Sequence, residues 1–234
     1  MLGTTALPTP ANAPRAVLFD AYGTLFDVYS VGALAEALFP GHGERLSLLW
    51  RDKQIEYTRL TSMSARYRPF WELTRAGLRF AAARLALTLS ADAEAQLMDQ
   101  YLHLAPFAEN AEVLVELKRR GVRCGILSNG DPRMLKAAVA SAGFGTLLDP
   151  LLSADSVQRF KTDAAVYALG PAAFGLAASE ILFVSSNGWD AIGATWYGYT
   201  TLWVNRAGLP LDALGTPPSR TGSSLHDVLD FFPV

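Results

Sequence analysis

Short apolar runs that alternate with helix-like segments constrain the fold of this chain more than any other feature of its sequence. Each run is too short for a helix and is rich in strand-forming residues, so we expect a buried strand at each. The four runs span 16–20, 122–127, 181–186 and 200–205. Helical patterns that end at or just before a glycine span 109–121, 131–143 and 187–198. This alternation predicts an α/β fold, with a Rossmann-like parallel sheet covered by helices on both faces.

The composition is that of a globular protein with a sizeable core. Half of the 234 residues are hydrophobic and 18% are charged. A net charge of −2 argues against a nucleic-acid binder, because phosphate backbones require clustered Lys and Arg. No stretch reaches the roughly 18 apolar residues of a membrane span. The one cysteine, Cys124, lies in an apolar run, so we expect a buried structural thiol and no disulfide.

The two ends of the chain carry the weakest patterns. Residues 1–14 contain no Lys or Arg and no apolar core long enough for a signal peptide, so we expect a frayed tail on a soluble, cytoplasmic protein. Residues 207–224 are rich in turn formers, and we expect 224–232 to close the fold as a short helix.

A helix-rich segment without any strand pattern interrupts the alternation directly after the first strand. An insertion at that point sits over the carboxyl end of the strand, so we expect a helical cap. Pro106 marks the return linker. We therefore divide the chain into core residues 15–28, a helical cap at 29–105 and the remaining Rossmann-like core at 106–234.

Polar residues gather where the predicted strands end, which is where parallel sheets bind ligands. They are Asp20, Ser128, Asn129, Ser185, Ser186 and Asn187. A lone Asp at a strand end is more often a helix cap or turn residue. For Asp20, however, Gly23 permits a tight turn, Thr24 offers a hydroxyl to the carboxylate, and the preceding strand is wholly apolar. A rigid, partly desolvated carboxylate of this kind suits covalent catalysis.

Several other site types are absent from the sequence. There is no P-loop, no G-x-S-x-G and no HExxH, and "GHGERL" and "GFGTLL" both lack the third glycine of a dinucleotide-binding motif. The three histidines, His42, His103 and His226, fall in unrelated segments, so we expect no shared metal site.

The motifs, taken in order, resemble the haloacid dehalogenase superfamily over nearly the whole chain. Its first motif is a nucleophilic Asp followed by x-x-Gly-Thr, as at Asp20 in "DAYGT". "ILSNG" at 126–130 resembles the second motif, Lys161 the third and Asp190 the fourth. The segments "FDAYGTLFDV", "LWRDKQIEYT", "LSNG" and "FVSSNGWDA" resemble the L-2-haloacid dehalogenase family more narrowly.

Tyr22 separates this chain from the phosphatases of that superfamily. They carry a second Asp two residues after the nucleophile, which protonates the leaving alkoxide, and they hold Mg²⁺ against the phosphate charge. A departing halide needs no proton. The resemblance therefore implies that Tyr22 forms an apolar wall against the substrate carbon, and that neither a metal nor an organic cofactor takes part.

The resemblance also implies roles for the positive groups. An anion that attacks an anionic haloacid needs fixed positive charge in the site. Arg51 on the cap is expected to hold the departing halide together with Asn129. Lys161 is expected to offset the carboxylates of Asp20 and Asp190.

The remaining family matches are supporting and pocket residues. Ser128 and nearby backbone N–H groups are expected to seat the substrate carboxylate, although Ser128 also fits a simple helix cap. The expected supports for Lys161 and the hydrolytic water are Tyr167, Ser185, Asn187 and Asp190, with Thr24 as a further catalytic residue. The expected substrate contacts also include Ala21, Ile55, Phe70 and Trp189. For Ile55, Phe70 and Trp189, packing in the hydrophobic core explains the residue type nearly as well.

Two positions depart from the family pattern. Thr162 replaces a common Pro after the catalytic Lys, which predicts a less rigid loop. Asp52 replaces a common Gln after the cap Arg, and a carboxylate there is expected to pair with Arg51.

The expected function is hydrolysis of short 2-haloalkanoic acids to 2-hydroxyalkanoic acids and halide, through a covalent aspartyl ester. The resemblance implies the L enantiomer as substrate, the D-2-hydroxyalkanoic acid as product, and a homodimeric protein. The alternatives are a Mg²⁺-dependent phosphatase of the same superfamily, disfavoured by Tyr22, and a non-catalytic binding protein on this fold. Retention of Asp20, Lys161 and Asp190 together disfavours the second alternative.

Overall fold

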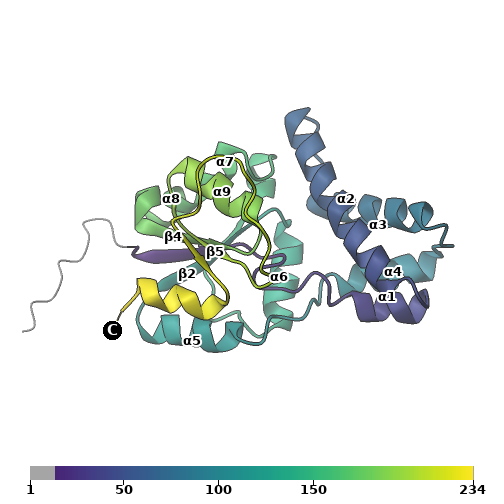
Figure 1. Cartoon of the computed structure of the whole chain (residues 1–234), viewed down its shortest axis with the longest axis horizontal. Helices are drawn as coiled ribbons and strands as arrows, with labels where there is room; N and C mark the ends of the chain where they lie inside the picture. The colour runs from purple at the N-terminus through teal and green to yellow at the C-terminus, as the bar shows by residue number, and fades with distance from the viewer. Residues whose placement is uncertain (1–13, 234) are drawn as a thin grey trace, which may run out of the picture.

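A six-stranded, fully parallel sheet forms the centre of the computed structural model, which describes residues 14–233 (Figure 1). The strand order is β3-β2-β1-β4-β5-β6. The strands are β1 (Ala16–Phe19), β2 (Arg123–Ser128), β3 (Leu151–Ser153), β4 (Ile181–Ser185), β5 (Thr200–Val204) and β6 (Arg220–Gly222). The predicted N-terminal tail lies outside the described residues, apart from residue 14.

All four predicted strands are confirmed, and they are the four central strands of the sheet. The two edge strands, β3 and β6, have only three residues each and were not predicted. β6 has the sequence Arg-Thr-Gly and no buried residue, so it lacks the apolar signal of a strand. The structure places it inside the segment expected to consist of turns.

Helices cover both faces of the sheet, as predicted. Figure 1 shows α7, α8 and α9 on one side and α5 with the C-terminal 3₁₀ helix on the other. The core helices are α5 (Asn110–Arg119), α6 (Pro132–Ser141), α7 (Ala164–Tyr167), α8 (Leu169–Phe174) and α9 (Gly188–Tyr197). The 3₁₀ helices are η1 (Ala154–Val157), η2 (Ala178–Glu180) and η3 (Leu225–Phe231), the last at the predicted closing helix. Across residues 14–233, no helix combines the length and apolar character that crossing a membrane requires.

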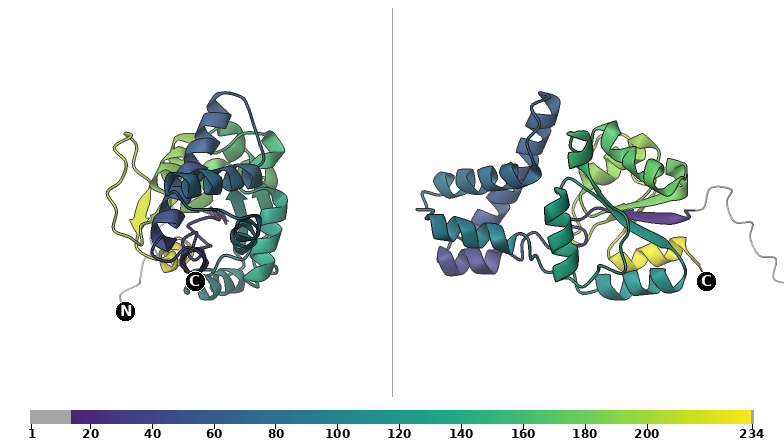
Figure 2. Two further views of the ribbon diagram at one scale, coloured as in Figure 1. Left: turned by 90° about the vertical axis from the view of Figure 1, so that its right-hand side faces the viewer. Right: turned by 180° about the vertical axis from the view of Figure 1, so that it is seen from behind.

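Four helices between the first and second strands pack on one another, to one side of the sheet (Figures 1 and 2). They are α1 (Gly32–Leu38), α2 (Gly43–Met63), α3 (Phe70–Arg84) and α4 (Ala91–Gln100). Two antiparallel linkers join this helical group to the core: Asp27 N donates to Ala105 O (2.8 Å), and Phe26 forms a bridge with Pro106.

The far end of α2 and the loop after it contact the core directly. Phe160 N donates to Ser62 Oγ (3.1 Å), and the Tyr67 hydroxyl donates to Asp155 Oδ1 (2.6 Å). The helical group is therefore fastened to the core at a second place, away from its linkers.

The register of the sheet brings the ends of three strands together. Phe19 pairs with Ile126 on β2 and with Val184 on β4. Asp20, one residue beyond β1, therefore emerges beside Ser128 and Ser185, which end the neighbouring strands.

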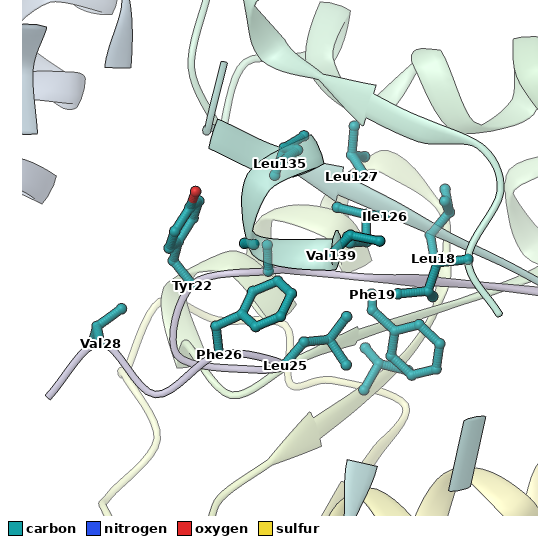
Figure 3. Packing of buried hydrophobic residues seen from close by; sticks show 14 of the residues in the cluster. Leu18, Phe19, Tyr22, Leu25, Phe26, Val28, Ile126, Leu127, Leu135 and Val139 are labelled. Atoms are coloured by element: carbon teal, nitrogen blue, oxygen red, sulfur yellow. The ribbon is translucent and has the colours of Figure 1, made fainter. Parts of the chain in front are cut away.

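The residues that support Asp20 form a dense apolar cluster. Figure 3 shows Leu18, Phe19, Leu25, Phe26 and Ile126 packed around the central strands. All five are completely buried. Burying a side chain of this size stabilises the fold by about 1.5–3 kcal/mol. The carboxylate therefore stands on a rigid base.

We predict that Gly125→Ala destabilises the protein. Its Cβ would lie 2.6 Å from the carbonyl oxygen of Pro150 and 3.2 Å from Leu18. Overpacking of this kind costs about 1–3 kcal/mol, and it outweighs the roughly 0.5–1 kcal/mol that Ala gains over Gly within a strand. Urea unfolding measures the difference.

Gly145→Ala is the matched control, because a Cβ at Gly145 meets nothing within 4 Å. Its free energy of unfolding is expected to stay within about 0.5 kcal/mol of wild type. Equal stability of both variants would contradict the close packing of β2.

Candidate active site

Lys161 bridges two carboxylates at the edge of the sheet where the strands end. Its Nζ donates to Asp20 Oδ1 and to Asp190 Oδ2, each at 2.9 Å. All three side chains are at least nine-tenths buried. Residues of the first, third and fourth predicted motifs, from distant parts of the sequence, therefore meet in one buried ionic cluster.

The second oxygen of Asp20 is also fixed. Its Oδ2 accepts hydrogen bonds from Thr24 Oγ1 (3.0 Å) and Asn187 Nδ2 (2.9 Å). Thr24 Oγ1 accepts in turn from Ser186 N (2.8 Å). The carboxylate is held by a hydroxyl, an amide and an ammonium group, and it has lost most of its contact with water.

The turn after Asp20 explains this placement. Ala21 is buried, and its carbonyl oxygen accepts from the backbone N–H groups of Leu25 (2.9 Å) and Phe26 (3.0 Å). Gly23 has a φ of +95°, which L side chains rarely adopt. The turn returns Thr24 beneath the carboxylate, as the Gly-Thr pair predicts.

Asp190 is oriented by two hydroxyl groups from different elements. Tyr167 donates to its Oδ1 (2.7 Å) and Ser185 Oγ to its Oδ2 (3.0 Å). Asp190 lies in the first turn of α9, where the helix dipole favours a negative charge. Tyr167, Ser185 and Asp190 thus join the cluster around Lys161, as predicted.

Burial and shared charge govern the pKa values in this cluster. Burial, followed by the negative charge of Asp20, raises the pKa of Asp190 to about 6 against the opposing effect of Lys161. Burial alone would lower the pKa of Lys161, but Asp190 and Asp20 together raise it. One ammonium group therefore serves two carboxylates, and Lys161 keeps its proton at neutral pH.

Arg51 is a buried cation, and the hydrogen-bond acceptors around its guanidinium group are all neutral. It comes from the middle of α2, where a long charged side chain would ordinarily be exposed, yet it is 9% exposed. Its Nη1 donates to Gln54 Oε1 (2.7 Å) and its Nη2 to Tyr22 O (2.9 Å) and Asn187 Oδ1 (3.5 Å). Within residues 14–233, no carboxylate lies within 4 Å of its guanidinium group. The charge of Arg51 is thus available to an anion.

The expected pairing of Asp52 with Arg51 is wrong. Asp52 is exposed, and no ion pair joins the two side chains in the described part of the chain. Consecutive residues on a helix point about 100° apart, so Asp52 faces away when Arg51 faces inward. Gln54, three residues on, shares the inner face instead.

Tyr22 is a buried, neutral phenol among aromatic rings. Its ring centroid lies 5.6 Å from that of Phe70 and 5.7 Å from that of Tyr101. Burial raises its pKa well above the ordinary value, with Tyr101 and Asp131 adding to the shift. Figure 3 shows the ring extending away from Phe26, and its hydroxyl has no partner within the described residues. The ring is thus uncharged and packed among other aromatic rings, and it carries one buried hydroxyl without a partner.

Ser128 is the last residue of β2 and Asn129 follows it, and both are buried. Ser128 Oγ accepts from Gly130 N (3.1 Å), and Asn129 Oδ1 accepts from Lys161 N (2.9 Å). The cap of α6 is Asp131, which accepts from Met134 N, so the reading of Ser128 as a helix cap is wrong. Asn129 was expected beside Arg51, but the asparagine that accepts from Arg51 is Asn187. Asn129 accepts from the backbone of Lys161 and so holds the loop that carries this lysine.

The three expected pocket residues divide into two groups. Phe70 is buried against Tyr22. Ile55 and Trp189 line a cavity of about 590 Å³ between α2 and α9, which also contains Asn187. A neighbouring cavity of about 540 Å³ reaches Lys161 and shares Trp189. These two cavities lead from the surface toward the ionic cluster.

The loop at Thr162 is held from both sides despite the missing Pro. Lys161 N donates to Asn129 Oδ1, and Asp163 N donates to Phe160 O (3.0 Å). Asp163 also accepts from Ala165 N and so caps α7. Side-chain and backbone hydrogen bonds thus fix the position of the lysine.

Other reactive side chains lie apart from this cluster. Cys124 is buried as predicted, and burial raises its pKa to about 12. Among residues 14–233, no group of three or more His, Cys, Asp or Glu side chains is arranged to hold a metal ion.

Two polar residues at the site were not predicted. Gln54 contacts Arg51 inside the helical group. Arg206 donates to Ser186 Oγ (2.8 Å) and Thr24 O (3.2 Å), and it pairs with Glu109 (2.8 Å). The sequence could have indicated the contact of Gln54 with Arg51, since residues three apart on a helix lie on the same face. Nothing in the turn-rich sequence around Arg206 indicated its partners.

Comparisons with known proteins agree with this geometry. The model of the haloacid dehalogenase-like hydrolase family matches residues 14–198. An (S)-2-haloacid dehalogenase of Pseudomonas sp. (strain YL) is 47% identical over 218 residues, which are 93% of this chain and 94% of that protein.

Solved structures give the same relationship. The crystal structure of an L-2-haloacid dehalogenase has 56% identity and a TM-score of 0.92, and the match covers 94% of this chain and 99% of that one. The L-2-haloacid dehalogenase of Xanthobacter autotrophicus with chloropropionic acid covalently bound has 34% identity and a TM-score of 0.86, covering 92% and 96%. The chain therefore belongs to the haloacid dehalogenase-like hydrolases and, within them, to the L-2-haloacid dehalogenases.

We predict that Lys161→Met is strongly destabilised, and more so at neutral than at acidic pH. The cation that lowers the pKa of Asp190 is lost, so this pKa rises further above 6. A carboxyl group whose pKa is raised by folding binds its proton more tightly in the folded state, so stability falls as the pH rises. We expect a loss of about 3–5 kcal/mol near pH 7.5, because buried charge is left uncompensated.

Urea unfolding at about pH 7.5 and about pH 5 measures this effect, since the penalty shrinks once one carboxyl group is protonated. Lys136→Met, at an exposed position on α6, is the control and is expected to show no such pH dependence. A loss for Lys161→Met that is independent of pH would contradict the ionic cluster.

Proposed function

We propose that this protein hydrolyses short L-2-haloalkanoic acids to D-2-hydroxyalkanoic acids and halide, through an ester formed on Asp20. The observation that carries the proposal is the combination of a desolvated Asp20 carboxylate with a buried Arg51 whose partners are all neutral. The site thus pairs a nucleophile with an uncompensated cation suited to a departing anion. The chloropropionic acid bound covalently to the Xanthobacter autotrophicus relative supports the same chemistry.

In the first step, a carboxylate oxygen of Asp20 attacks C2 from the face opposite the halogen. The new C–O bond forms as the carbon–halogen bond breaks, and the halide leaves with the bonding electrons toward Arg51. Tyr22 adds no second carboxylate beside the nucleophile, and because burial raises its pKa it is a poor acid. Attack from the opposite face inverts the configuration at C2.

In the second step, water attacks the carbonyl carbon of the Asp20 ester. The bond between the carbonyl carbon and the substrate oxygen breaks, one proton of the water passes to that oxygen as the hydroxy acid leaves, and the other proton is released to solvent. The Asp20 carboxylate is restored with one oxygen from water. We assign Asp190, Ser185 and Asn187 to the surroundings of this water. With a pKa of about 6, Asp190 is mostly ionised at neutral pH and accepts a hydrogen bond from it. Lys161 stabilises the negative charge that develops on the ester carbonyl.

Ser128 and the backbone N–H groups after it are our proposed seat for the substrate carboxylate, with Asn129 beside it. We propose that Ile55, Phe70, Trp189 and Ala21 complete the substrate pocket. We also propose that residues 29–105 act as a cap domain on the core formed by 15–28 and 106–234, because α2 and α3 supply Arg51, Ile55 and Phe70 to a site whose other residues come from the core.

The direct test of the proposed function measures halide release from chloroacetate, bromoacetate and the two 2-chloropropionate enantiomers. We expect release from the acetates and from the L enantiomer, with D-lactate as the product of the latter. Turnover is expected to survive EDTA, because no second acid accompanies Asp20. Turnover of an aryl phosphate that depends on Mg²⁺ would instead support the phosphatase alternative. Binding of haloacids without any halide release would support a binding protein.

Arg51→Lys is predicted to lower kcat by about tenfold or more, because a point charge cannot replace the planar donor set of a guanidinium around a leaving anion. Arg45→Lys, at an exposed position on the same helix, is the control and is expected to leave kcat unchanged. Steady-state halide release measures both variants. A normal kcat for Arg51→Lys would show that the halide leaves elsewhere.

We further propose that the protein is cytoplasmic. We also propose that it works as a homodimer, as the family resemblance implies. Exposed apolar side chains on the helical group support self-association: Leu48, Leu60, Met63 and Phe80. Light scattering that gave the mass of one chain would contradict the dimer.

A further inference from the structure

A buried polar network inside the helical group ends on Arg51. Gln54 is completely buried, and its Oε1 accepts from Arg51 Nη1 (2.7 Å) and from the Tyr101 hydroxyl (2.9 Å). Its Nε2 donates to Thr74 Oγ1 (2.7 Å). Thr74 Oγ1 donates its own proton to Phe70 O (2.8 Å). Gln54 thus links α2, α3 and the end of α4 to the guanidinium group.

These hydrogen bonds leave the Gln54 amide a single orientation. The Thr74 proton is already committed to Phe70 O, so Thr74 Oγ1 only accepts from Gln54. The Tyr101 hydroxyl donates from the other side. A flipped amide would turn its NH₂ group toward the guanidinium and its oxygen toward Thr74 Oγ1, and it would lose the hydrogen bonds to both. The network therefore keeps an acceptor oxygen facing Arg51.

The neutrality of Gln54 matters as much as its geometry. An acidic residue would fix Arg51 equally well, but its charge would compensate the guanidinium and weaken the attraction for another anion. The other acceptors, Tyr22 O and Asn187 Oδ1, are neutral too. The lysine differs in this respect, because two carboxylates already surround it.

We infer that Gln54 is the positioning residue of the halide site: it fixes the Arg51 guanidinium while leaving its positive charge for the departing halide. The inference rests on the proposed function, in which Arg51 receives the halide. Thr74 and Tyr101 act through Gln54 by setting the orientation of its amide.

The test is Gln54→Glu, which keeps the size of the side chain and adds one negative charge beside Arg51. Calorimetry measures the binding of sodium bromide, as the probe of the halide site, and of sodium propionate, as the probe of the carboxylate seat. We expect bromide to bind about tenfold more weakly or worse, and propionate to change by less than about twofold. We also expect kcat for 2-chloropropionate to fall with little change in KM.

Gln96→Glu is the matched control, because it makes the same chemical change at an exposed position of α4. Its bromide affinity is expected to equal that of wild type. Tyr101→Phe is the milder second variant. It keeps the ring and removes one donor to Gln54, and we expect bromide affinity to fall by about threefold.

Unchanged bromide affinity in a folded Gln54→Glu protein would overturn the inference. Equal weakening of bromide and propionate would also overturn it, because that result indicates general damage to the site. If Gln54→Glu fails to fold, Tyr101→Phe decides by the same two criteria. Calorimetry needs no turnover, so wild-type protein that binds bromide but releases no halide would refute the proposed function separately.

Discussion

The placement of one buried ammonium group between two carboxylates is the constraint on which the rest of the site depends. Asp20 follows the central strand, Asp190 begins a helix after the next strand, and Lys161 comes from a loop between them. Removing three charges from water is expensive, and it is offset only when each charge has close partners. The parallel sheet supplies this arrangement, because its register brings the carboxyl ends of β2, β1 and β4 together. The hydroxyls of Thr24, Ser185 and Tyr167 then occupy the remaining acceptor positions.

Lys161 and Arg51, the two buried cations described above, differ in the charge of the groups that surround them. Lys161 is surrounded by carboxylates from the core, whereas Arg51 is brought from the helical group and meets only neutral acceptors. In the proposed mechanism, the Asp20 carboxylate beside Lys161 begins the attack, and the uncompensated charge of Arg51 receives the departing anion. Tyr22 adds no charge to the site, because burial keeps its phenol neutral. Such a site favours displacement of a halide over transfer of a phosphoryl group.

Much of this structure could be predicted from the sequence, because its strongest features are local. The four central strands were evident as apolar runs, and the Gly-Thr turn indicated how Thr24 reaches Asp20. The edge strand β6 could not be found, since its Arg-Thr-Gly sequence buries no side chain and depends on pairing with β5. The expected contact between Asp52 and Arg51 does not form, because consecutive residues on a helix point in different directions. The partners of Arg206 and the Thr74–Gln54–Tyr101 network depend on tertiary contacts that no local pattern records.

The central claim is that Asp20 itself attacks the substrate carbon, and a single turnover in H₂¹⁸O with excess enzyme tests it most directly. If Asp20 forms an ester, water strikes the carbonyl carbon of that ester, and the product hydroxyl oxygen comes from the carboxylate. Mass spectrometry of the enzyme and of the hydroxy acid locates the label. We predict ¹⁸O in the Asp20 carboxylate and none in the product of the first turnover. Label found directly in the hydroxy acid would contradict the covalent mechanism and would make Asp20 a general base.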